Sequence, residues 1–244
     1  MGEKMNSEIK EVFKNTIFSN KKVRIKLLGD SITHGEGGSG FNQDGEHIIG
    51  DYFRNKAGYC WANLFKKHME TQYNCIVENN ACTGTKIEFI IDNFETLVSD
   101  DDDIVFCAIG TNNRHQCFCD GEKRNKDDYM SEFYNNILTL NTMFKESNKT
   151  VVFIANIPAS NKNEQDGNDY WRIFHMNDVC DLYKKASEEA GFNFINLYEA
   201  FNKYCTDHGI SVDSLLADGL HPNDKGHTII FDLIRHTGVE PRMP

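Results

Sequence analysis

Two short motifs far apart in the chain contain the residue types needed for nucleophilic attack on an acyl carbon. Ser31 follows Gly29-Asp30 at the end of an apolar run, whereas Asp218 and His221 stand three positions apart near residue 220. A serine hydroxyl is a weak nucleophile at neutral pH, so it needs a base to accept its proton and an acid to orient that base. One turn could bring the Asp218 carboxylate to one ring nitrogen of His221 while the other nitrogen faces Ser31.

Each of these residues also has an ordinary structural explanation. A lone loop serine more often caps a helix or stabilises a turn, and Asp218 could cap the turn in which His221 is a surface imidazole. Pro222 suits the first position of a final helix, which would fix the geometry of this motif. Thr33 occupies the place of the second glycine in the α/β-hydrolase nucleophile elbow, so that fold is disfavoured.

Acyl transfer also needs hydrogen-bond donors for the negative oxygen of the tetrahedral intermediate. Gly84 could present its backbone N–H at close range because it has no side chain, and Asn112 could donate from its side-chain amide. Either segment alone would more often be a strand-to-helix turn.

Apolar runs of strand length alternate with segments of helical periodicity, which predicts a parallel sheet covered on both faces. The expected fold is a three-layer α/β/α sandwich. We expect strands at residues 23–28, 75–78, 103–109, 151–157 and 192–197, and helices at 61–71, 86–97, 128–146, 170–190, 197–208 and 223–235.

Ser31, Gly84, Asn112 and Asn156 each follow one of the expected strands. The carboxyl ends of parallel strands meet at one edge of a sheet, so these loops should converge on one crevice. Three long polar loops leave the same edge, at residues 34–58, 112–127 and 159–169, and should form walls of a substrate site. The acidic run 100–103 lies at the opposite end of a strand and is expected to be a solvated loop without a function.

Length and composition predict a single folded domain over residues 1–244, with residues 1–20 as an extension or helix. The net charge of −11 would repel nucleic acid and anionic membranes, so neither is an expected partner. No apolar stretch approaches the roughly 20 residues that span a bilayer, and the charged first 20 residues do not look like a secretion signal. We therefore expect a cytoplasmic protein, and its oligomeric state stays open.

The eight cysteines are expected to be free, buried thiols, because several fall inside apolar elements. Cys117 and Cys119 lie beside His115, but their spacing does not match a zinc site. No metal is expected.

Taken together and in this order, the four motifs resemble those of the SGNH hydrolases, also called GDSL-type esterases and lipases. The resemblance runs from Gly29 to the helix after His221. It implies a flavodoxin-like five-stranded sheet and no cofactor. It also implies roles for five residues: Ser31 as nucleophile, His221 as base, Asp218 as orienting acid, and the Ser31 and Gly84 N–H groups with the Asn112 side chain as the oxyanion hole.

One position departs from the family pattern. The third motif usually has aspartate after its asparagine, whereas this chain has Asn113. The change puts the stability and local charge of that loop in question, but not the chemistry.

The resemblance does not select one ester, because relatives act on acetylated sugars, lysophospholipids, acyl thioesters or aryl esters. The amide, charged and aromatic groups of the long loops suit sugar hydroxyls and ring faces, so we expect a carbohydrate O-acetyl esterase acting on a small or glycan ester. Candidate substrate contacts are Asp30, Asn113, Arg114, Trp61 and Trp171. The alternatives are a merely solvated loop surface, a lysophospholipase or thioesterase for longer acyl chains, and an inactive relative that binds carbohydrate.

Overall fold

Five parallel strands form the central sheet of the computed structural model, which describes residues 22–42, 46–114, 125–160 and 172–236. All five lie where the apolar runs predicted them, within a few residues at each end. Across the sheet their order is β4 (Cys75–Asn79), β1 (Val23–Gly29), β5 (Ile104–Ala108), β6 (Thr150–Ala155) and β7 (Asn193–Asn196).

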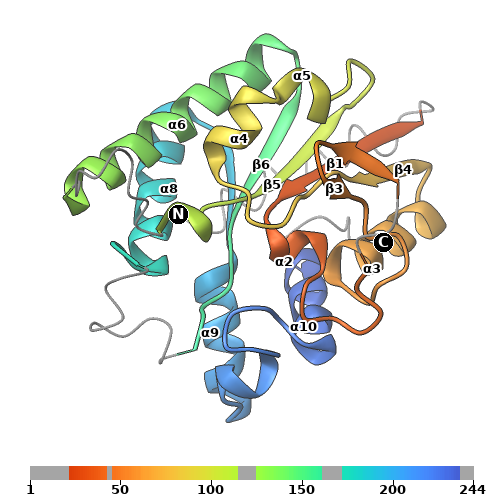
Figure 1. Cartoon of the computed structure of the whole chain (residues 1–244), viewed down its shortest axis with the longest axis vertical. Helices are drawn as coiled ribbons and strands as arrows, with labels where there is room; N and C mark the ends of the chain where they lie inside the picture. Colours follow the sequence, from red (N-terminus) through yellow and green to blue (C-terminus); the bar gives the residue numbers. More distant parts are fainter. Residues whose placement is uncertain (1–21, 43–45, 115–124, 161–171, 237–244) are drawn as a thin grey trace, which may run out of the picture.

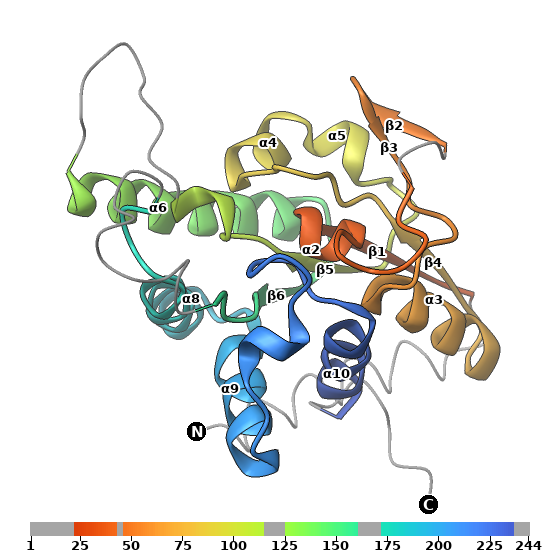
Figure 2. The same cartoon turned by 60° about the horizontal axis from the view of Figure 1, so that its bottom comes forward.

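Helices cover both faces of this sheet, which confirms the three-layer α/β/α fold (Figures 1 and 2). One layer consists of α3 (Trp61–Gln72), α9 (Leu197–His208) and α10 (Asp224–Ile234). The other consists of α4 (Ile87–Asp92), α5 (Phe94–Leu97), α6 (Lys126–Glu146) and α8 (Met176–Ala190). Within the described ranges, no helix combines the length and apolar character needed to cross a membrane.

The strands are apolar almost throughout because successive side chains point to opposite helical layers. In β1, Ile25 and Leu27 pack into the layer of α3, α9 and α10, whereas Leu28 packs into the other. Every residue of β5 is buried. This pattern leaves the strand ends and the loops that follow them as the place for polar chemistry.

Several helix boundaries differ from the sequence expectation. The helix predicted over 86–97 is divided at Asn93, whose side-chain amide donates to the Phe89 carbonyl at 2.8 Å and so competes with the helical backbone pattern. Helix α8 begins at Met176, and the Asp178 carboxylate accepts the backbone N–H of His175, its N-cap residue, at 2.8 Å. Residues 170 and 171 of the predicted helix lie outside the described residues.

The sequence did not predict the short elements in the loops. These are α2 (Ser31–His34), the hairpin of β2 (His47–Ile49) and β3 (Tyr52–Phe53), and the 3₁₀ helices η1 (Asn112–Arg114) and η2 (Val212–Leu215). Six cysteines are buried and free, as expected, and Cys117 and Cys119 lie outside the described residues.

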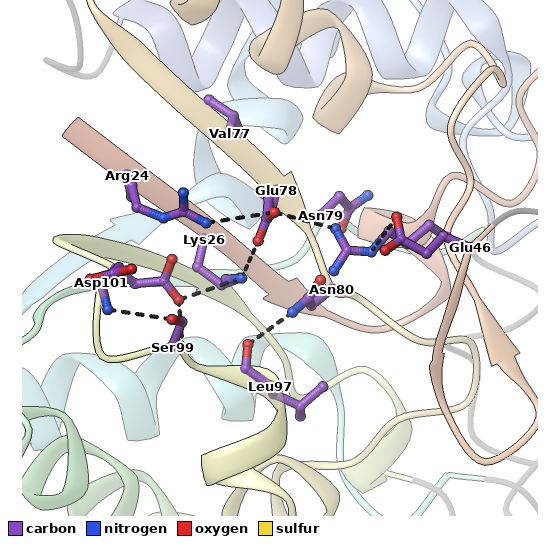
Figure 3. Close-up of polar contacts among 12 residues, drawn as sticks. Arg24, Lys26, Glu46, Val77, Glu78, Asn79, Asn80, Leu97, Ser99 and Asp101 are labelled. Carbon is purple, nitrogen blue, oxygen red and sulfur yellow. Dashed lines mark hydrogen bonds and ion pairs between the residues drawn. The ribbon is translucent and has the colours of Figure 1, made fainter. Parts of the chain in front are cut away.

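A group of charged side chains, here called the strand cluster, crosses from β1 to its neighbours; it comprises Arg24, Lys26, Arg54, Glu78 and Asp102. The Nζ atom of Lys26 lies 2.6 Å from Glu78 Oε2 and 3.5 Å from Asp102 Oδ2. Arg24 also reaches Glu78, so both cations of β1 converge on one carboxylate (Figure 3).

The strand cluster corrects one prediction. The acidic run 100–103 is not uniformly solvated, because Asp102 is only 3% exposed and accepts a hydrogen bond from the Ser99 N–H at 2.8 Å. Its burial is compensated by Lys26.

Candidate active site

Ser31 is the first residue of α2, directly beyond the carboxyl end of β1. Asp30 caps this helix, because its Oδ1 atom accepts the Ile32 N–H at 3.0 Å. The short strand-to-helix turn holds the serine at the sheet edge that the sequence predicted.

The structure brings Ser31, His221 and Asp218 into one hydrogen-bonded line. The Nε2 atom of His221 lies 2.9 Å from Ser31 Oγ, and its Nδ1 atom lies 2.7 Å from Asp218 Oδ2. The other carboxylate oxygen, Oδ1, accepts the backbone N–H groups of Leu220 and His221 at 2.9 and 2.8 Å. Burial alone would raise the pKa of Asp218, but its hydrogen bonds with His221 and Leu220 hold that pKa below the ordinary value.

The loop that carries Asp218 and His221 is closed by its own backbone. Leu216 and Pro222 form an antiparallel bridge, and the Ala217 N–H donates to the His221 carbonyl at 2.8 Å. The loop lies beside α2, ahead of α10 (Figure 2). The prediction that Pro222 begins the last helix is wrong, because Asn223 is the N-cap and Pro222 instead helps to close the loop.

A second carboxylate approaches the imidazole of His221. Glu36 Oε2 lies 2.9 Å from Nε2 of His221, the same nitrogen that faces Ser31. Burial alone would lower the pKa of His221, but Glu36 and Asp218 raise it to about 9. Sequence reasoning missed Glu36, since this residue lies outside the recognised motifs.

A buried polar network connects the loops after three strands. The Nδ2 atom of Asn156 lies 2.8 Å from both Asp30 Oδ2 and Thr111 Oγ1. Asp30 is 0% exposed, and burial raises its pKa to about 6 although Thr111 and Ile32 donate hydrogen bonds to it. Sequence reasoning placed Asn156 at the correct edge of the sheet but gave it no role, and it missed Thr111.

The two segments expected to bind an oxyanion are joined to each other. Asn112 Nδ2 donates to the carbonyl of Thr85 at 2.9 Å, which places this amide next to Gly84. Because the amide carries two N–H groups, one remains for another acceptor. Gly84 has φ +75°, and a Cβ added there would meet no atom within 4 Å, so backbone conformation rather than space favours glycine.

Four of the five predicted substrate contacts are buried: Asp30 and Arg114 are 0% exposed, Trp61 is 2% and Asn113 is 7%. Arg114 Nε donates to the Thr111 carbonyl at 3.2 Å, and Trp61 packs edge-on against Phe65 in the core. These side chains therefore have structural partners inside the fold, and their contact with a substrate stays a prediction. Trp171 lies outside the described residues.

The side chain of Glu88 explains why residue 113 is an amide and not a carboxylate. Its Oδ1 atom accepts the Ile87 N–H at 3.1 Å, and its Nδ2 atom donates to Glu88 Oε2 at 2.9 Å. An aspartate could accept the first bond but could not donate the second. The departure from the family pattern thus fits the presence of Glu88 on α4.

Comparison with known proteins bears on the family and on the fold. The sequence model of the GDSL-like lipase/acylhydrolase family matches residues 27–229. A search of curated proteins gave no match.

Three solved structures illustrate the similarity of the fold. A putative GDSL-like lipase from Parabacteroides merdae has a TM-score of 0.68 at 19% identity and covers 92% of this chain and 100% of its own. Axe2, an acetylxylan esterase from Geobacillus stearothermophilus, has a TM-score of 0.66 at 20% identity and covers 92% and 97%. The acetyl xylan esterase AlAXEase has a TM-score of 0.62 at 20% identity and covers 88% and 98%.

Proposed function

Because the chain belongs to the GDSL-like lipase/acylhydrolase family and is an ester-hydrolysing serine hydrolase, we propose that Ser31 is its nucleophile, His221 its general base and Asp218 the acid that orients this base. The observation that carries the proposal is the line of contacts at 2.9 and 2.7 Å through the imidazole. Solved catalytic mutants of Axe2 replace a serine, an aspartate and a histidine, the same three residue types.

In the first half of the reaction, Ser31 Oγ attacks the ester carbonyl carbon while Nε2 of His221 accepts the hydroxyl proton. The carbonyl oxygen becomes negative and accepts hydrogen bonds from the N–H groups of Ser31 and Gly84 and from the Asn112 amide. The tetrahedral intermediate then expels the alcohol, whose oxygen takes the proton from Nε2. An acyl group remains on Ser31.

In the second half, water replaces the alcohol. Its oxygen attacks the acyl carbon while Nε2 of His221 accepts a proton, and the same donors stabilise the second oxyanion. Collapse of this intermediate returns the proton to Ser31 Oγ and releases the carboxylic acid.

Asp218 selects the tautomer that this cycle requires. Two backbone N–H groups hold Asp218 Oδ1, and this orients Oδ2 to accept a hydrogen bond from Nδ1 of His221. The proton of the neutral ring is therefore favoured on Nδ1. The lone pair of the neutral ring is then on Nε2, facing the serine hydroxyl.

For the substrate, we propose a short acyl group, most simply acetyl, on a carbohydrate hydroxyl. Acetylxylan esterases are among the proteins of similar fold, which supports this choice. The polar and aromatic character of the loop sequences supports it as well.

The test compares purified protein and Ser31→Ala on p-nitrophenyl esters from acetate to decanoate and on acetylated xylo-oligosaccharides. We expect hydrolysis that is fastest with acetate and absent in the variant. A preference for decanoate would instead indicate a lysophospholipase or thioesterase. Sugar binding without turnover of any ester would indicate an inactive relative.

A further inference from the structure

Two oxygen atoms of different chemistry meet one ring nitrogen in this site. Ser31 Oγ and Glu36 Oε2 each lie 2.9 Å from Nε2 of His221. A hydroxyl can donate to a neutral Nε2, whereas a carboxylate can only accept from a protonated one. The neutral ring therefore binds Ser31, and the imidazolium ring binds Glu36.

The backbone of Glu36 is anchored at both of its polar groups. Its N–H donates to the Ser31 carbonyl at 3.0 Å, and its carbonyl lies 3.2 Å from Nε2 of His227 on α10. The side chain of Glu36 is 25% exposed, so solvent only partly screens its charge.

The next residue explains how the loop comes so close to the base. Gly37 has φ +85°, and a Cβ built there would clash with the Pro222 carbonyl and lie 2.9 Å from Cβ of His221. Only glycine fits this approach without displacing the loop that carries the base. Glu36 is thus held against His221 by the fold, unlike a freely moving surface side chain.

We propose that Glu36 is a positioning residue of this site: its carboxylate binds the protonated Nε2 of His221 in the free enzyme and must release it before Ser31 can be deprotonated. The inference rests on the proposed function, in which His221 is the general base. It makes Glu36 the residue that sets the pH at which hydrolysis begins.

The carboxylates around His221 favour its protonated form. Asp218 lies on its own loop, Glu36 follows α2, Asp30 lies beyond β1 and His227 is on α10. Burial lowers the pKa of His227 to about 4, so this ring is neutral when His221 titrates. The carboxylates outweigh burial and raise the pKa of His221 to about 9, so the neutral, base-competent form grows as the pH rises toward that value.

The experiment replaces the carboxylate by an amide of the same shape, Glu36→Gln. The titration of His221 is followed by NMR of its imidazole signals, assigned by their loss in His221→Ala, and kcat/KM for p-nitrophenyl acetate is measured from pH 6 to 10. The control, Glu95→Gln, removes the same charge from an exposed position on α5.

We expect the His221 midpoint and the acidic limb of kcat/KM to fall by about one pH unit in Glu36→Gln, because an adjacent opposite charge typically shifts a pKa by that amount or more. At pH 7, kcat/KM should rise severalfold, whereas the plateau at high pH should fall because the imidazolium of the intermediate loses one partner. The two pH profiles therefore cross. Glu95→Gln should leave both measurements unchanged.

An unchanged His221 midpoint in folded Glu36→Gln would overturn the inference even if Ser31→Ala abolishes hydrolysis. If the His221 midpoint falls in Glu36→Gln but the unaltered protein hydrolyses no ester, the contact with Glu36 is supported and the proposed function is contradicted. Should the variant not fold, the unaltered protein still decides, because a His221 midpoint at or below the ordinary value of about 6.5 contradicts the contact.

Discussion

Two regions of the molecule gather charged side chains in buried or half-buried surroundings, and they differ in how those charges are balanced. In the strand cluster, Lys26 lies between Glu78 and Asp102, and Lys26 and Glu78 are direct neighbours across β1 and β4. In the candidate active site, two carboxylates flank the single imidazole of His221. A permanent cation holds the first group together, whereas a titratable ring holds the second.

Because of this difference, we expect the strand cluster to contribute to stability and the candidate active site to contribute to catalysis. In the strand cluster, Lys26 pairs with Glu78 and Asp102 in one arrangement of ion pairs. Histidine has two protonation states that bind different partners, and only such a group can accept a proton from a nucleophile and return it. Substitutions in the strand cluster should therefore act on the free energy of unfolding, and those in the active site on the rate.

The largest effect is expected for Ser31→Ala. Removing the attacking oxygen should lower kcat/KM by a factor on the order of 10⁴ or more, because the remaining groups cannot form an acyl intermediate. The midpoint of urea unfolding should change little. The control is Ser131→Ala, at an exposed position on α6. Substantial hydrolysis by Ser31→Ala would contradict the contrast between the two regions, since the site around Ser31 and His221 would then not be catalytic.

The next largest effect is expected for Lys26→Met, and it should appear in stability. The substitution leaves Glu78 and the buried Asp102 without their shared cation, and breaking a buried pair in this way typically costs about 3–5 kcal/mol. Urea unfolding measures the loss, and kcat of the folded fraction should stay close to that of the unaltered protein.

Lys203→Met is the control for this prediction. Lys203 pairs with Asp207 at 2.7 Å on the exposed side of α9, and such pairs contribute only about 0.3–0.5 kcal/mol. Equal losses in the two lysine variants would show that burial does not distinguish the strand cluster from an ordinary surface pair.

Asn112→Ala should lower the rate of hydrolysis and leave the free energy of unfolding nearly unchanged. Loss of one oxyanion donor typically lowers kcat by about 10²–10³-fold, with little change in KM because the charge it stabilises exists only in the transition state. Steady-state kinetics with p-nitrophenyl acetate measures this, with Asn135→Ala at an exposed position on α6 as the control. A change confined to KM would assign Asn112 to substrate binding instead.

The sequence predicted those parts of the molecule that depend on local patterns. Five apolar runs were enough to place the strands, and parallel strands necessarily bring the residues after their carboxyl ends to one edge. For this reason Ser31, Gly84 and Asn112 could be placed together. His221 follows no strand and lies 190 residues from Ser31, so it was associated with Ser31 by residue type and by the resemblance to the SGNH hydrolases. The turn from Asp218 to His221 is local and was predicted from spacing alone.

What the sequence could not predict depends on the paths of loops and on register. Glu36 reaches His221 only because Gly37 lets one loop pack against another, and no periodic pattern encodes that approach. Lys26 stands in an apolar run, but its partner Glu78 follows from the pairing of β1 with β4. Polar residue type also could not reveal that Asp30 and Arg114 make hydrogen bonds inside the fold, because their partners lie in other loops or in the backbone.

Asn113 lies beside Asn112 in the chain, but its substitution should change the free energy of unfolding and not the rate of hydrolysis. Asn113→Asp has the smallest expected effect of these variants. The new carboxylate would lose the hydrogen bond to Glu88 Oε2, now 2.9 Å long, and place two negative charges together. Its oxygen can still accept the Ile87 N–H at the start of α4, so the net loss should be only about 1–2 kcal/mol.

This loss should depend on pH in a predictable direction. Repulsion raises the pKa of one of the two carboxyls in the folded state, so the folded protein binds more protons than the unfolded chain and stability falls as the pH rises. Urea unfolding should therefore show a larger loss for Asn113→Asp at pH 8 than at pH 5. Adding Glu88→Gln should restore most of the stability because the amide can again donate to the carboxylate. If the double variant is no more stable than Asn113→Asp, contact with Glu88 is not the reason for asparagine at this position.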